Sequence, residues 1–262
     1  MVAMAIAKKK RSTEELAKFS EVVQKHMDSE RGSRGGALLS DIILGGQDGL
    51  VNVLGIVLGV ASATSDKYIV LVAGLVATFG ESVSMAAVAY ASSRAEQDHY
   101  RKEMEQEKWE MEHLPEVETE EIRLIYMRKG LRGRELDQMV KTVTGNKELW
   151  LSTMMTEELG LTPVENINPY RTAAIVGVTA IIGSLIPLIP FIFFGVWESI
   201  AYSFVLSTLV LFAVGVYKAK TTVGNWLKSG VELAGVGILA ALVGYLVGKI
   251  LGSWFGLGNV PA

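Results

Sequence analysis

The chain has 262 residues, of which 50% are hydrophobic before its 27 glycines are counted, and its mean hydropathy is +0.32. Soluble domains usually reach about 45–50% apolar residues only with glycine included, so this composition argues against an ordinary soluble protein. The net charge of −3 favours no charged partner, and the lack of cysteine excludes disulfides and thiolate metal sites.

Five hydrophobic segments each approach the roughly 20 residues that a helix needs to cross a bilayer. They run over about residues 38–63, 68–92, 172–194, 199–217 and 230–255. No stretch shows the apolar–polar alternation of a strand. The sequence therefore predicts an all-α membrane protein with five transmembrane helices and a cytosolic insert of three to four helices between the second and third.

The composition divides the chain into tails, membrane parts and one polar insert. We expect an N-terminal cytosolic tail (1–36), transmembrane helices 1 and 2 (37–93), an acidic metal-binding insert (94–168), transmembrane helices 3 to 5 (169–258) and a C-terminal tail (259–262). With a cytosolic N-terminus, only Lys67 and Lys249 of the 25 basic residues fall near the far side. Because lysine and arginine gather in cytosolic loops, the N-terminus and the insert are predicted to be cytosolic.

Two motifs in the later segments bear on packing. Gly244, Gly248 and Gly252 form a ridge of small residues that allows close helix approach, within the subunit or against a second subunit; we prefer the first. Pro187 and Pro190 predict a bend near the outer interface.

The insert holds 17 acidic and 11 basic residues, and so a net charge of −6. Its breakers and apolar spacing predict helices at about 95–113, 119–129, 133–144 and 147–159.

Asp48 lies in the middle of the first hydrophobic segment, and Asp41 and Asn52 share its helical face. A carboxylate at the bilayer centre costs roughly 3 kcal/mol or more, so such a residue normally faces a partner, a water-filled path or a substrate. The oxygens suit divalent cations. The alternatives are a structural hydrogen bond for Asp48 and an exposed interfacial acid for Asp41.

Glu81 and Met85 lie one turn apart in the second segment. A thioether adds little for Mg²⁺ or Ca²⁺, so the pair favours Fe²⁺, with Mn²⁺, Co²⁺ and Zn²⁺ as relatives. Core packing is the alternative for Met85. A desolvated carboxylate tends to hold a proton, and a bound metal ion expels that proton. A site that alternates between a metal ion and a proton is the minimum part of an antiporter. A channel can use the same acids.

The insert carries acids at ligand-compatible spacings on three predicted helices. These candidate metal ligands are Glu103, Glu107, Glu110, Glu118, Glu121, Met154 and Glu158. A solvated acidic face is the alternative. Glu110 and His113 form one Glu-x-x-His element, but a di-iron site needs two and the chain has only three histidines. We therefore expect no enzyme. We also expect no cofactor and no nucleic-acid partner.

Several motifs together resemble the vacuolar iron transporter family. They are Asp41-Ile-Ile-Leu-Gly-Gly-Gln-Asp-Gly-Leu50, Ser84-Met85 with Ala95-Glu-Gln-Asp-His-Tyr100, Trp150-Leu-Ser-Thr-Met-Met-Thr-Glu-Glu-Leu-Gly-Leu161 and Pro187-Leu-Ile-Pro190. The resemblance covers roughly residue 41 to the C-terminus. It implies a homodimer that exports Fe²⁺, and often Mn²⁺, from the cytosol in exchange for protons.

The resemblance also implies roles for individual residues. Asp41, Asp48 and Met85 line a path at the dimer interface. The metal ligands of the insert are Glu107, Glu110, Glu118, Glu121, Met154 and Glu158. One departure concerns the glutamate that the plant-type pattern has eight residues before the methionine. That position is Ala77 here, and the acid is Glu81. Glu232, early in the fifth segment, remains without a role.

The sequence thus predicts a multi-pass transporter of a prokaryotic cell membrane, with a vacuolar or other endomembrane as the alternative. The rival functions are a membrane-anchored ferrous oxidase and a metal-binding sensor that moves no ions.

Overall fold

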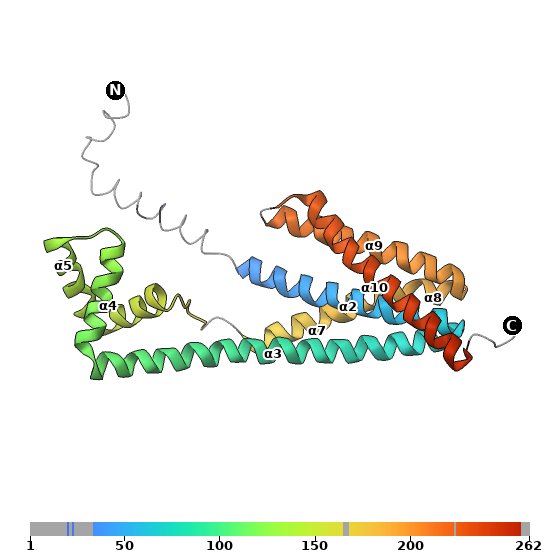
Figure 1. Ribbon diagram of the computed structural model, residues 1–262, viewed down its shortest axis with the longest axis horizontal. Helices are drawn as coiled ribbons and strands as arrows, with labels where there is room; N and C mark the ends of the chain where they lie inside the picture. Colours follow the sequence, from blue (N-terminus) through green and yellow to red (C-terminus); the bar gives the residue numbers. More distant parts are fainter. Residues whose placement is uncertain (1–19, 21–22, 24–33, 165–167, 223, 258–262) are drawn as a thin grey trace, which may run out of the picture.

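The computed structural model describes residues 20, 23, 34–164, 168–222 and 224–257, and these residues contain helices and no strand (Figure 1). The predicted tails, 1–36 and 259–262, lie almost wholly outside them. The main α-helices are α2 (Arg34–Thr64), α3 (Lys67–His113), α4 (Pro115–Arg128), α5 (Gly133–Thr144), α6 (Lys147–Thr153), α7 (Pro169–Leu185), α8 (Ile189–Phe193), α9 (Val196–Thr221) and α10 (Trp226–Phe255). A π-helical turn, η2 (Met154–Glu158), follows α6, and a 3₁₀ turn, η3 (Ile186–Leu188), follows α7.

Five of the described helical segments are long and apolar enough to cross a membrane, which confirms the predicted number of spans. They are Leu38–Thr64, Lys67–His113, Pro169–Phe193, Val196–Thr221 and Trp226–Phe255. Large apolar side chains cover their outer faces, among them Val72, Ile182 and Leu239. Such an exterior suits lipid.

Helix α3 joins the membrane bundle to the insert. It has 47 residues, and at 1.5 Å per residue it is about 70 Å long, more than twice the ~30 Å hydrocarbon core. Asp66 begins it by accepting hydrogen bonds from the backbone N–H groups of Tyr68 and Ile69. In Figure 1, α3 runs along the length of the molecule and carries α4 and α5 at one end, beyond the bundle.

Helix α2 packs against α3, α7, α9 and α10. Glycines bring its backbone close to the backbones of α7 and α10. A Cβ added at Gly49 would lie 2.4 Å from the carbonyl oxygen of Ala180 in α7. One added at Gly248 in α10 would lie 1.9 Å from the carbonyl oxygen of Gly59. The ridge at Gly244, Gly248 and Gly252 therefore packs within the subunit, as preferred from the sequence.

Gly248→Ala is expected to destabilise the fold by about 1–3 kcal/mol, the usual cost of an overpacked interior. The clash is with backbone, so α2 and α10 must separate to relieve it. Gly235→Ala on the same helix is the control, because nothing lies within 4 Å of the added Cβ. Thermal unfolding in detergent measures both, and equal melting temperatures would contradict the packing.

The proline pair, for which the sequence predicted a bend, interrupts the third span with the 3₁₀ turn η3, and serines of α9 hydrogen-bond to the carbonyl groups of the two prolines. The Ser199 hydroxyl donates to the carbonyl oxygen of Pro190 at 3.0 Å, and the Ser203 hydroxyl donates to that of Pro187 at 2.8 Å. Both serines are fully buried. This internal pairing is what allows irregular backbone at membrane depth.

The insert has its own apolar core, formed mainly by α4, α5 and α6 around Ile122, Val140, Val143 and Trp150. Helix α5 has the predicted bounds, and α4 begins earlier than predicted because Pro115 is well suited to the first helical turn.

Candidate metal sites

The first candidate site lies between α2 and α3, within their membrane-spanning parts. The Asn52 amide donates to Glu81 Oε1 at 3.0 Å and approaches Asp48 Oδ2 at 3.4 Å. Two carboxylates from different helices thus meet at one amide. The sequence placed Asp48 and Asn52 on one face, but it did not indicate that Glu81 lies opposite them.

The structure bears on Ala77, which stands where the plant-type pattern has a glutamate. That side chain packs against the apolar core around Val53 and Phe191, whereas Glu81, one turn further, reaches Asn52. Met85 is half-buried one turn beyond Glu81, with no ligand-like contact recorded among the described residues. Asp41 lies two turns from Asp48, where the guanidinium of Arg171 interacts with it.

The cluster is open on one side of the subunit. Asn52 is exposed, and Asp48 and Glu81 are half-buried. Ser84 and Ile56, one turn away on the same side, are exposed as well. Three polar groups therefore face outward at a depth where lipid would be a poor solvent for them.

Glu232, without a role in the sequence analysis, lies 4.0 Å from Lys228 on the exposed first turns of α10. This ion pair is exposed and includes no residue of the cluster, and the role of Glu232 stays open.

The second candidate site lies in the insert and consists of two groups of glutamates that share Glu118. Glu107, Glu110 and Glu118 form one group, and Glu118, Glu121 and Glu158 form the other. Within each group, one carboxylate oxygen per residue lies within 4.8 Å of the others. The acids come from α3, α4 and η2, so only the folded insert assembles them.

Burial distinguishes Glu107 and Glu118 from a solvated face, whereas Glu158 is exposed. Glu107 is 5% exposed and Glu118 is 3% exposed, and Oε2 of each lacks a hydrogen-bond partner. Desolvation, reinforced by Glu158 and other nearby carboxylates, raises the pKa of Glu107 to about 7. Desolvation, reinforced by Glu121 and others, likewise raises the pKa of Glu118 to about 7. Near neutral pH, each of these carboxyls is therefore poised to exchange its proton for a cation.

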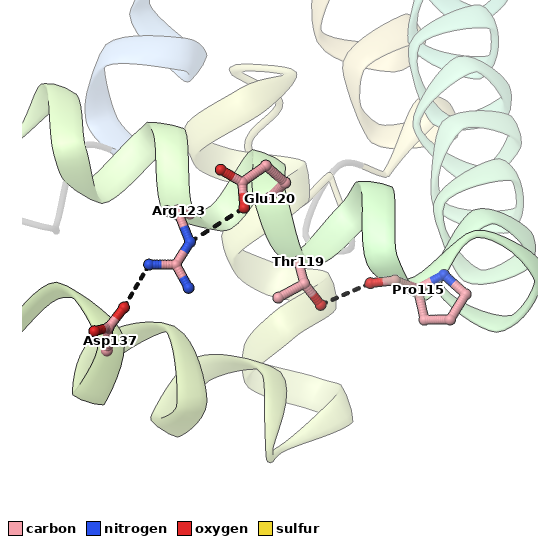
Figure 2. A network of polar contacts seen from close by, with 5 residues as sticks. All are labelled: Pro115, Thr119, Glu120, Arg123 and Asp137. Carbon is pink, nitrogen blue, oxygen red and sulfur yellow. Dashed lines mark hydrogen bonds and ion pairs between the residues drawn. The ribbon is translucent and has the colours of Figure 1, made fainter.

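The basic residues of the insert pair with other acids. Figure 2 shows Arg123 bridging Glu120 at 3.1 Å and Asp137 at 2.5 Å, which ties α4 to α5. Among the described residues, no recorded ion pair involves any member of the two glutamate groups. The groups thus concentrate negative charge with no resident counter-charge.

The π-helical turn brings the last acid into position. The prediction of one regular helix over 147–159 is wrong at its end, where Leu159 N–H bonds to the carbonyl oxygen of Met154 across a widened turn. Such π turns are frequent at functional sites. Lys129 Nζ lies 2.6 Å from Glu157 Oε1 and fixes this turn to the end of α4. The sequence analysis missed this ion pair, since no periodic signal links residues so far apart.

The other predicted ligands of the insert, Met154 and Glu103, lie outside the two glutamate groups. Met154 is fully buried in the apolar core of the insert. Glu103 contacts Lys102 at 3.2 Å and His99 at 3.6 Å, and it belongs to neither group. His113 stacks on Trp109, and neither group of described residues contains a histidine. The Glu-x-x-His element is therefore not assembled as in a di-iron site.

Comparison with known proteins gives this geometry its context. The sequence profile described as the VIT family matches residues 39–249, which span both candidate sites. This chain belongs to the VIT family.

The curated relatives of this VIT-family chain are similar over most of their length. Vacuolar iron transporter 1 of Oryza sativa subsp. japonica is 31% identical over 225 residues, covering 86% of this chain and 89% of the relative. Vacuolar iron transporter 1 of Arabidopsis thaliana is 29% identical over 224 residues, covering 85% and 90%. Vacuolar iron transporter of Plasmodium falciparum (isolate 3D7) is 29% identical over 223 residues, covering 81% and 82%. The resemblance inferred from the motifs is thus confirmed at the level of the family.

Proposed function

We propose that this VIT-family protein carries Fe²⁺, and also Mn²⁺, out of the cytosol in exchange for protons. The observation that carries the proposal is the Asp48–Asn52–Glu81 cluster on the membrane-spanning parts of α2 and α3. Two carboxylates compensate a divalent charge, and Met85 one turn away offers a soft ligand that favours Fe²⁺ over Mg²⁺. The names of the curated relatives support iron as the cargo.

The insert would capture the metal before transport. Glu107 and Glu118, whose pKa values burial raises to about 7, would release their protons as an ion binds, so capture strengthens as pH rises through about 7. Helix α3 continues without a break from Glu107 to Glu81, so it connects the capture site to the cluster of the bundle.

We further propose that two copies associate through the open side of the cluster. A second subunit there would cover polar groups that lipid solvates poorly, and it would double the number of carboxylates along the path. Asp41, Asp48, Asn52, Glu81 and Met85 would then line a path between the copies.

Cross-linking tests the homodimer, and the absence of cysteine gives a clean background. Ser84→Cys and Ile56→Cys, on the open side of the cluster, are expected to form covalent dimers with a short bis-maleimide. Leu209→Cys, 61% exposed on α9, is the control and should remain monomeric. Cross-linking at Leu209 but at neither test position would place the contact elsewhere and contradict this arrangement.

Transport itself is tested with purified protein in liposomes. We expect Fe²⁺ uptake that accelerates when the lumen is acidic, with proton release matching metal entry. Metal binding without flux would favour the sensor, and Fe²⁺ oxidation without flux would favour the oxidase.

A further inference from the structure

A second feature of the bundle lies on the opposite side of α2 from the metal cluster. It is an apolar groove of about 470 Å³ between α2, α7 and α9, within the range of about 300–1,000 Å³ of ligand sites. Its lining includes Ile42, Gly46 and Leu50 of α2, Ile182 of α7 and Val214 of α9.

The chemistry of the lining excludes a hydrated ligand. Apart from Gln47 and Thr179, every lining side chain is aliphatic or aromatic. The hydroxyl of Thr179 is already bonded to carbonyl oxygens of its own helix, at Ile175 and Val176. The groove therefore offers contact surface to a hydrocarbon and little to a polar molecule.

The dimensions of the groove match one leaflet. Along α2 it extends from Leu39 to Leu50, which is roughly 16 Å at 1.5 Å per residue. Half of the ~30 Å hydrocarbon core is roughly 15 Å. The groove thus extends from the insert-side end of the bundle to about mid-membrane, the reach of one acyl chain.

Positive charge lies at the insert-side end of the groove. Val210 and Val214 line it, and Lys218 continues the same four-residue row of α9. Lys220 lies one turn beyond Tyr217, which also lines the groove. Two residues apart, Lys218 and Lys220 lie about 160° from each other around α9, so they flank the end of the groove on its two sides. Both lysines are exposed, and within the described part of the chain neither forms an ion pair.

A second subunit is the rival occupant. Gly46 and Leu50 are each two residues from Asp48, which places them about 160° around the helix from it. A copy that covers the open side of the metal cluster therefore leaves the groove facing lipid.

We propose that this groove binds one acyl chain of an anionic phospholipid from the insert-side leaflet, with the headgroup phosphate on Lys218 and Lys220. Basic residues beside a cleft between transmembrane helices are a known arrangement for anionic headgroups. The inference requires no transport activity, so it stands or fails separately from the proposed function.

Native mass spectrometry of the full-length protein in detergent tests it with equimolar dioleoyl phosphatidylglycerol and phosphatidylcholine. We expect phosphatidylglycerol to be retained at least about fivefold over phosphatidylcholine, and glycerol phosphate not to compete. Lys218→Gln with Lys220→Gln should bring the ratio close to one. Lys249→Gln, near the C-terminal end of α10, is the matched charge control and should leave the ratio unchanged.

Val214→Trp fills the groove and should lower retention of both lipids, and Ala213→Phe narrows it from a neighbouring position if the first variant folds poorly. Equal retention of the two lipids by the wild type, or a ratio unaffected by the lysine changes, would overturn the proposal. Maleimide-linked dimers at Val214→Cys would assign the groove to a second copy and overturn it as well.

Discussion

Asp48→Ala is expected to slow Fe²⁺ uptake into proteoliposomes by about 100-fold. The carboxylate offsets the cost of a divalent ion at membrane depth, and losing roughly 3 kcal/mol of such compensation corresponds to about two powers of ten. The change also leaves the Asn52 amide with Glu81 as its remaining carboxylate partner. Initial rates with and without a pH gradient measure the effect.

Glu232→Gln is the matched control, because it removes an acid from the same bundle whose one ion pair within the described residues is with Lys228 at the surface. It should retain nearly wild-type flux. Unchanged flux in Asp48→Ala, with Glu232→Gln equally active, would remove the cluster from the transport path.

Glu118→Gln is expected to weaken Mn²⁺ binding by the insert by about 100-fold, since Glu118 belongs to both glutamate groups. Calorimetric titration of the full-length protein in an Asp48→Ala background reduces the contribution of the membrane site. Glu116→Gln, two residues earlier on α4 and exposed, is the control. Equal affinities for the two variants would mean that the groups are only a charged surface.

The same variant should become more stable without metal, which separates ligand loss from misfolding. Since burial raises the pKa of Glu118 from 4.5 to about 7, the metal-free fold binds more protons than the unfolded chain between these values. Stability is therefore lost as pH rises through about 7. At pH 8, Glu118→Gln removes that cost and should gain on the order of 1–2 kcal/mol. At pH 4 the gain should vanish.

The membrane part of the fold was predictable because its signal is local. Each span is a run of apolar residues long enough to cross a bilayer, and the structure has five such helices. The break at Pro187 and Pro190 was equally local. The supporting serines, Ser199 and Ser203, were missed, although their four-residue spacing on an apolar helix was a usable signal.

The sites were predictable only in part, because they depend on how helices meet. Spacing indicated that Glu107 and Glu110 share a face, but not that Glu107 is buried or that Glu118 joins two groups. Those facts follow from the packing of α3, α4 and η2. The π turn before Glu158 escaped prediction for a similar reason: its local sequence reads as an ordinary helix, and Lys129 holds the turn from another element.

The unbroken α3 has a mechanical consequence. Glu81 and Glu107 are 26 residues apart on one rod, or roughly 39 Å. Pivoting that rod by about 10° at its inner end sweeps the outer glutamates through roughly 7 Å. A small rotation of α3 beside Asn52 would therefore become a large displacement of the insert, and a displacement of the insert would act back on Glu81.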